Sequence, residues 1–270
     1  MDSFSSTSGG FLQPGITSPT PSASTATPSH LPKPRAHPLR AGSTKETAVI
    51  NHIDQALLTI NRRHAKKFSS ALEETHGSGT SGYESFKEVA TDIDAIVDIL
   101  WVSGTPSLEI PYLISLAGMV TSYLPEYPFS ARPTFRLLRK LDTVFASLLL
   151  GEDVDTGAPL PGFEGRRNLI SMTEKVRIKS IAETCRIAVV EARETQDAPI
   201  EELNDDDDDD ADFESENEMA DILGVEDYGD APGRWEMEAA RVYEKTIQLL
   251  GDELGKQGDL CNIDELDQQS

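Results

Sequence analysis

The residues with the clearest chemical potential form a run of carboxylates in the C-terminal part of the chain. Residues 197–230 contain seventeen Asp and Glu residues and no Lys or Arg. Negative charges at this density attract basic surfaces and repel the phosphates of nucleic acid. The run therefore predicts a binding site for a basic protein partner. Its centre consists of six consecutive aspartates: Asp205, Asp206, Asp207, Asp208, Asp209 and Asp210.

Three interpretations of this acidic run remain open. It can bind a basic partner such as a histone tail, it can act as a solubilising linker, or it can mask basic clusters of the same chain. The formal net charge of −23 comes mostly from the run, because residues 43–196 sum to only −3. The acidity therefore belongs to an appendage and not to the body of the protein.

Basic residues cluster at the end of the first predicted helix and on one face of the fourth, with a smaller group near the start of the fifth. Such clusters bind phosphates, act as nuclear import signals or form ordinary solvated helix faces. The negative net charge argues against direct nucleic-acid binding. The candidate basic patch consists of Arg62, Arg63, Lys66, Lys67, Arg136, Arg139 and Lys140, and the smaller group of Lys175, Arg177 and Lys179.

The chain carries no recognisable motif for catalysis or cofactor binding. It has neither a G-x-x-x-x-G-K-[ST] phosphate loop nor a G-x-G-x-x-G turn. Asp153, Asp155 and Glu164 fit positions 1, 3 and 12 of a calcium loop, but Gly157 and Ala158 stand where an oxygen ligand and a glycine belong. We therefore expect a non-enzymatic protein without cofactor or metal. An enzyme without a recognisable motif is the third alternative for function.

Helical periodicity dominates residues 43–196. The second predicted helix has the clearest pattern, a single apolar stripe from Phe86 to Trp101, which predicts that Trp101 is a core residue. S-x-x-E capping boxes at Ser43 and Ser171 mark the starts of the first and fifth helices. Strand-like alternation is absent from the sequence. We therefore predict an all-α fold, an antiparallel bundle of about five helices.

Segments of different composition flank the predicted bundle. Residues 1–42 are rich in Ser, Thr and Pro, so they are expected to form a disordered arm. The acidic linker spans residues 197–232 and is also expected to be disordered. Residues 233–256 are predicted to form a C-terminal helix that docks on the bundle, followed by a polar tail over residues 257–270. The apolar face of this helix consists of Ala240, Tyr243, Ile247, Leu250 and Leu254.

Two further segments bear on the architecture. Residues 108–124 are the most apolar stretch, but with Glu109 and Pro111 they are too short for a membrane span, so we predict a helix buried in the bundle. Residues 151–170 show no periodic pattern and form either a packed surface loop or a binding loop. Phe163 is a candidate anchor for this loop.

Several short stretches carry a family resemblance: residues 102–108 (VSGTPSL), 135–142 (FRLLRKLD), 151–157 with 160–164 (GEDVDTG and LPGFE), and 241–246 (RVYEKT). They resemble a family of uncharacterised fungal proteins, some of which carry a meiotic-recombination name. The resemblance implies a nuclear accessory factor in chromatin or meiotic recombination, and it brings no catalytic residues. This role is the alternative to the leading expectation.

The leading expectation is a non-enzymatic protein–protein interaction module in the nucleus or shuttling between nucleus and cytoplasm. Its acidic run would bind or shield basic surfaces. An intracellular, reducing compartment fits because Cys185 and Cys261 lie far apart and form no disulfide framework. We expect a basic protein partner, no direct nucleic-acid binding and no membrane association.

Overall fold

The structure is a computed structural model that describes residues 31–67, 81–163, 169–194 and 234–261, apart from the side chains of Arg234, Glu253 and residues 255–261. Within these ranges the chain folds into α-helices and one short 3-10 helix, without a β-strand. The predicted all-α class is confirmed. The predicted disorder of residues 1–30 and of the acidic linker falls outside the described residues.

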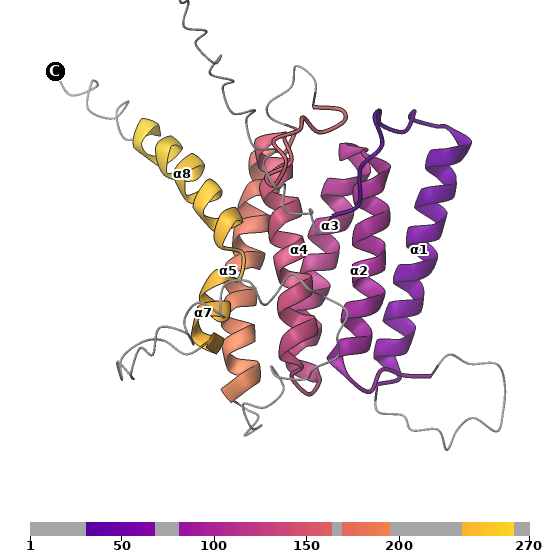
Figure 1. The fold of residues 1–270 in the computed structure, drawn as a ribbon, viewed down its shortest axis with the longest axis vertical. Helices are drawn as coiled ribbons and strands as arrows, with labels where there is room; N and C mark the ends of the chain where they lie inside the picture. The colour runs from indigo at the N-terminus through magenta and orange to yellow at the C-terminus, as the bar shows by residue number, and fades with distance from the viewer. Residues whose placement is uncertain (1–30, 68–80, 164–168, 195–233, 262–270) are drawn as a thin grey trace, which may run out of the picture.

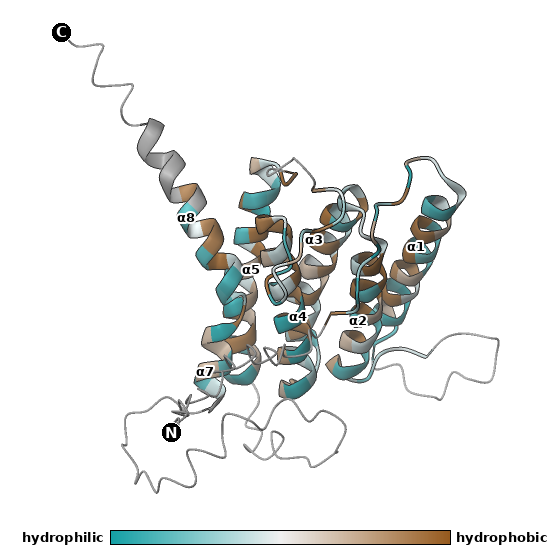
Figure 2. Ribbon diagram, turned by 45° about the horizontal axis from the view of Figure 1, so that its top comes forward, coloured by the Kyte–Doolittle hydropathy of each residue, from teal (hydrophilic) through white to brown (hydrophobic). Residues whose placement is uncertain are grey.

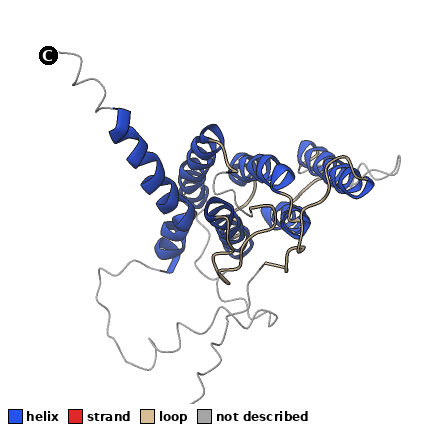
Figure 3. Ribbon diagram, turned by 90° about the horizontal axis from the view of Figure 1, so that it is seen from above, coloured by secondary structure: helices blue, strands red, loops and turns tan. Residues whose placement is uncertain are grey.

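Helices α1 to α5 run alternately up and down the bundle, and α7 and α8 follow one another in the same direction (Figure 1). Helices α2 and α4 pack together, as do α3 and α5, and α2 also contacts α3. Helix α1 packs on α2 at one edge, and α8 packs against both α4 and α5 at the other, as seen from above in Figure 3. The elements are α1 (Thr44–Ala65), α2 (Phe86–Ser103), α3 (Pro106–Tyr123), the 3-10 helix η2 (Leu124–Glu126), α4 (Ala131–Leu150), α5 (Met172–Glu194), α7 (Arg234–Arg241) and α8 (Glu244–Cys261).

The core lies where the apolar stripes of these helices meet, and the outward faces are mostly hydrophilic (Figure 2). Trp101 is only 2% exposed, which confirms its predicted place in the core. Leu113 and Leu116 of α3 are fully buried, because this helix lies at the centre of the bundle and packs against α2, α4 and α5. No helix in the described part of the chain is long and apolar enough to span a bilayer.

The predicted capping box at Ser171 is confirmed, and the one at Ser43 forms in part, because Glu46 reaches the N–H of Gly42 instead of that of Ser43. The Ser43 hydroxyl accepts a hydrogen bond from the backbone N–H of Glu46, whose carboxylate accepts one from the N–H of Gly42. The Ser171 hydroxyl accepts a hydrogen bond from the N–H of Glu174, and the Glu174 carboxylate accepts the N–H of Ser171 at 2.7 Å. In both cases the serine hydroxyl satisfies an N–H group that the first turn of the helix leaves without a partner.

The boundary predicted for the disordered arm, residues 1–42, is wrong, because residues 31–42 belong to the folded part of the chain. Residues 31–42 pack across the upper end of α2, with Leu31 and Leu39 buried. The N–H of Arg35 donates to the carbonyl of Val102, and the N–H of Leu39 donates to the Thr105 hydroxyl. Composition suggested disorder because the segment is rich in proline, but its two leucines find apolar neighbours that lie far away in the sequence.

The loop after α4 is a packed surface loop in its described part, residues 151–163. Phe163 is buried, which confirms it as an anchor, and its ring lies so close to Gly151 that a Cβ there would meet it at 3.1 Å. Gly162 has a φ of +82°, and a Cβ there would meet Pro38 and Pro106 at about 3 Å. The loop and residues 31–42 therefore cover the same end of the bundle.

The C-terminal segment is two helices and not the single helix predicted over residues 233–256. The break between α7 and α8 lies at Tyr243, whose φ of +53° is unusual for a residue with a side chain. Asp142 of α4 stabilises the break. Its carboxylate accepts hydrogen bonds from the N–H of Lys245 at 3.2 Å and from the N–H and hydroxyl of Thr246 at 2.9 and 2.6 Å. A carboxylate from another helix thus caps α8, which the periodicity of the segment itself cannot reveal.

Candidate interaction surfaces

The predicted partner-binding aspartates, Asp205 to Asp210, lie outside the described residues. Within the described ranges, no group of three or more His, Cys, Asp or Glu residues could hold a metal ion. The segment with calcium-loop spacing forms a turn. In this turn the Asp153 carboxylate accepts hydrogen bonds from the N–H of Asp155 at 3.0 Å and from the hydroxyl of Thr156 at 2.7 Å. Asp155 itself pairs with Lys245 of α8 at 3.6 Å.

The predicted basic cluster at the end of α1 divides into a structural part and an exposed part. Arg63 donates to Asp92 at 2.7 Å and to Glu88, both on α2, and its guanidinium lies 4.0 Å from the centre of the Tyr83 ring. Lys67 pairs with Glu126 of η2. These two cations therefore hold α1 against its neighbours. The exposed part consists of Arg62 and Lys66.

His64 packs into this cluster through its ring. Its ring stacks on Tyr123 with the ring centres 3.6 Å apart, and its Nδ1 lies 2.7 Å from the hydroxyl of Tyr127. Burial, and secondarily the charge of Lys67, lowers the pKa of His64. The end of α1 is thus a packed junction of aromatic and ionic groups rather than a uniform basic patch.

The predicted cluster on α4 also divides. Lys140 is only 9% exposed, and its amine pairs with Asp94 at 2.8 Å and with Asp98 at 2.9 Å, both on α2. Asp94 and Asp98 of α2 therefore face a partner helix. Arg136 and Arg139 stay exposed.

Five arginines come together where the N-terminal half of α4 meets α7 and the end of α5. Arg193 lies 4.5 Å above the ring of Trp235, which in turn packs on Phe135 of α4 with the ring centres 5.1 Å apart. Glu238 of α7 lies 3.9 Å from two of the guanidiniums. We call this region the arginine surface: Arg132, Arg136 and Arg139 of α4, Arg193 of α5 and Arg241 of α7. Sequence reasoning missed Arg132, Arg193 and Arg241, because only the tertiary fold brings their helices together.

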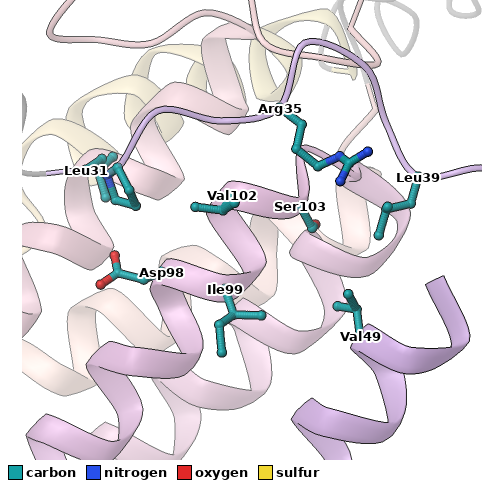
Figure 4. A pocket seen from close by; sticks show the side chains of 9 residues that line it. Leu31, Arg35, Leu39, Val49, Asp98, Ile99, Val102 and Ser103 are labelled. Carbon is teal, nitrogen blue, oxygen red and sulfur yellow. The ribbon is translucent and has the colours of Figure 1, made fainter. Parts of the chain in front are cut away.

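A groove of about 660 Å³ lies between residues 31–39, the start of α1 and the end of α2 (Figure 4). Its walls are mainly apolar, with Leu31, Val49 and Ile99 among them, and Arg35 and Asp98 contribute charged groups. The groove exists because the extended segment crosses over the end of α2 and is held there by the hydrogen bonds from the N–H of Arg35 to the Val102 carbonyl and from the N–H of Leu39 to the Thr105 hydroxyl.

Glu109 is a buried carboxyl that serves the fold of α3. Its Oε1 accepts a hydrogen bond from the N–H of Thr105 at 2.8 Å, so it caps the first turn of the helix. The side chain is only 3% exposed, and burial raises its pKa to about 8. Glu109 therefore carries a proton near neutral pH in the native state.

This buried carboxyl predicts a pH dependence of stability. Between pH 4.5 and 8 the native state keeps a proton that the unfolded chain releases, so the free energy of unfolding falls as pH rises through this window. The loss is at most about 1.4 kcal/mol for each pH unit, so we expect roughly 1–4 kcal/mol between pH 5 and 8. Glu109→Gln keeps an acceptor for Thr105 but cannot ionise. Urea unfolding of both proteins at several pH values should show a flatter profile for the variant, and parallel profiles would contradict the prediction.

Comparisons with known proteins add a family match. The model of a family described as subunit 11 of the general transcription factor TFIIH (TFB6) matches residues 82–251, from just before α2 into α8. An uncharacterized protein of Schizosaccharomyces pombe is 23% identical over 143 residues, which is 51% of this chain and 73% of that protein. No solved structure matches with significance. The fungal relative agrees with the resemblance seen in the sequence, but neither match carries a meiotic-recombination name.

Proposed function

The chain belongs to the family of subunit 11 of the general transcription factor TFIIH, and we propose that it is a non-enzymatic nuclear accessory protein of a TFIIH-like transcription complex. The family match over residues 82–251 is the observation that carries this proposal. The matched range includes α2 to α7, the first half of α8 and the whole acidic run. The proposal therefore concerns the folded body together with its acidic run.

The chemistry of the described residues supports a scaffold rather than a catalyst. Glu109 and Asp142 are buried carboxyls, and both cap helices. Cys185 is buried, and burial raises the pKa of its thiol to about 12, so it is a poor nucleophile. Glu109 and Asp142 thus have structural roles. An accessory protein of this kind acts through its surfaces and its acidic run.

Association with TFIIH can be tested directly. The full chain is mixed with purified TFIIH and separated by size-exclusion chromatography, and we expect part of the chain to elute with the complex. A variant in which the six aspartates at positions 205–210 are changed to Asn tests whether the acidic run makes the contact. Elution of the unaltered chain only at its own volume, at low and at physiological salt, would refute the proposed association.

We also propose that the acidic run binds a basic protein surface. Seventeen carboxylates within residues 197–230 attract cations over a range of about 8 Å at physiological salt. With histone as the probe, we expect binding at low salt that weakens steeply as salt rises. The Asn variant of residues 205–210 should bind about tenfold more weakly, because each exposed ion pair contributes roughly 0.2–1 kcal/mol.

The matched control for this measurement neutralises exposed carboxylates on the bundle. Glu183→Gln with Glu236→Gln removes acidic charge from α5 and α7, where both residues are exposed. We expect a smaller loss of histone binding per charge removed than in the Asn variant. Equal losses per charge would mean that net charge alone attracts the histone. Unchanged melting temperatures would show that neither variant alters the fold.

A further inference from the structure

We propose that the groove between residues 31–39, the start of α1 and the end of α2 binds a short segment of a partner protein in which a large apolar side chain stands beside a carboxylate. The apolar side chain occupies the groove, and the carboxylate pairs with Arg35. Residues 31–39 and α1 lie outside the range that matches the family, so this site goes beyond the proposed function.

The first argument is the apolar surface that the fold leaves uncovered. Val102 of α2 is 37% exposed, and Ile99 and Val49 of the same groove are only partly buried. Covering such surface with another apolar side chain is favourable, because both are removed from water. The groove of about 660 Å³ is within the size range of ligand sites, so it has room for a Leu or Phe side chain.

The open shape of the groove favours a protein segment over a small molecule. Sites for small molecules enclose most of the surface of their ligand. Here Val102 and the exposed Arg35 stand at the surface of the protein, so an occupant of the groove keeps one side in solvent. A side chain that projects from the surface of a partner protein meets this condition.

The second argument is charge complementarity. Arg35 is exposed, and no carboxylate pairs with its guanidinium among the described residues. Residues 31–42 contain two further Lys or Arg residues and no acidic residue. Asp98 also lines the groove, but Lys140 compensates its charge at 2.9 Å. The charge that remains at the groove is therefore positive, and guanidinium groups form strong, often bidentate hydrogen bonds with carboxylates.

The third argument is that the groove is formed without the partner. The N–H of Arg35 donates to the Val102 carbonyl, which fixes the segment at the end of α2. The N–H of Leu39 donates to the Thr105 hydroxyl and fixes the same segment a second time. Figure 4 shows the Arg35 side chain extending from this segment over the groove. A wall that is already in place lowers the entropic cost of binding.

The floor of the groove contains a polar group that lacks a partner. Ser103 is only 4% exposed, and its hydroxyl has no hydrogen-bond partner among the described residues. A buried hydroxyl without a partner is unfavourable. The groove therefore suits a segment that brings polar groups next to its apolar side chain, as a peptide does.

The test measures the binding of a fluorescent synthetic peptide to the full chain at physiological salt by anisotropy. In this peptide one Phe stands between two Glu residues, and Gly and Ser make up the rest. We expect saturable binding. A peptide with Gln in place of both Glu residues tests the charge, and a peptide with Ser in place of Phe tests the apolar contact. Each should bind at least about fivefold more weakly, because each lacks one of the two interactions.

Two matched pairs of substitutions locate the site on the chain. Arg35→Gln should weaken binding about threefold to fivefold, whereas Arg40→Gln removes an exposed cation outside the groove and should leave binding unchanged. Val102→Ser should weaken binding about fivefold, whereas Val176→Ser changes an exposed valine of α5 and should have no effect. Arg35→Gln should also bind the Glu and Gln peptides almost equally, because the pair that distinguishes them is gone. Thermal unfolding of each variant checks that the bundle is intact.

Three results would overturn the proposal. Absence of binding at protein concentrations up to about 1 mM would mean that the groove does not take this class of ligand. Equal effects within either matched pair would mean that the peptide responds to total charge or to any exposed apolar residue. Binding to a chain that starts at residue 31, but not to the full chain, would assign the groove to residues 1–30 instead of a partner. The assay contains no TFIIH, so its outcome is independent of the co-elution experiment.

Discussion

A chain that ends at residue 232 is expected to lose its cooperative unfolding transition. The truncation removes α7 and α8, and α8 packs against both α4 and α5. Val242, Tyr243 and Leu250 are buried in that contact. Burying one large apolar side chain contributes about 1.5–3 kcal/mol, and whole domains are stable by only about 5–15 kcal/mol. Loss of all three side chains, together with the cap from Asp142, removes a large part of that stability.

Circular dichroism during heating measures this effect. A chain that ends after Leu254 is the matched control, since it keeps the packed turns of α8, and we expect its melting temperature to stay within a few degrees of the full chain. Asp142→Ala should give an intermediate result, with a loss of about 1–2 kcal/mol from removal of the helix cap. An unchanged melting temperature for the chain that ends at residue 232 would show that α7 and α8 do not stabilise the bundle.

Replacement of Trp101 by alanine should destabilise the protein by about 3–5 kcal/mol. The indole is 2% exposed and belongs to the main apolar cluster, so its removal leaves a cavity that the surrounding helices cannot fill. Its Nε1–H has no hydrogen-bond partner among the described residues. Burial of an unpaired donor is unfavourable, so packing and not hydrogen bonding must account for the contribution of this residue.

Trp101→Phe is the matched control, because it keeps an aromatic ring and removes the unpaired N–H. We expect it to cost clearly less than the alanine variant, since the cavity is smaller and an unsatisfied polar group is lost. Urea denaturation followed by circular dichroism gives the free energy of unfolding for each protein. A loss below about 1 kcal/mol for Trp101→Ala would contradict a core role.

The sequence by itself determined the helical class and the start of several helices, because these features depend on residues close together in the chain. The apolar stripe of α2 leads to Trp101 at helical spacing, and the structure buries that residue. The capping boxes at Ser43 and Ser171 join residues only three apart, and in both the serine hydroxyl accepts the N–H of the glutamate as predicted. Local spacing suffices for such features, since the helix itself brings the partners together.

Only the tertiary structure decided which charged residues are structural and which remain exposed. Lys140 and Arg136 look alike in the sequence, yet Lys140 faces Asp94 of α2 while Arg136 faces solvent. The break between α7 and α8 depends on Asp142, which lies more than a hundred residues earlier in the chain. Electrostatic pairs and caps of this kind require groups to come within about 4 Å, and only the packing of distant helices achieves this. The arginine surface arises in the same way, because its five residues come from three helices that meet only in the folded protein.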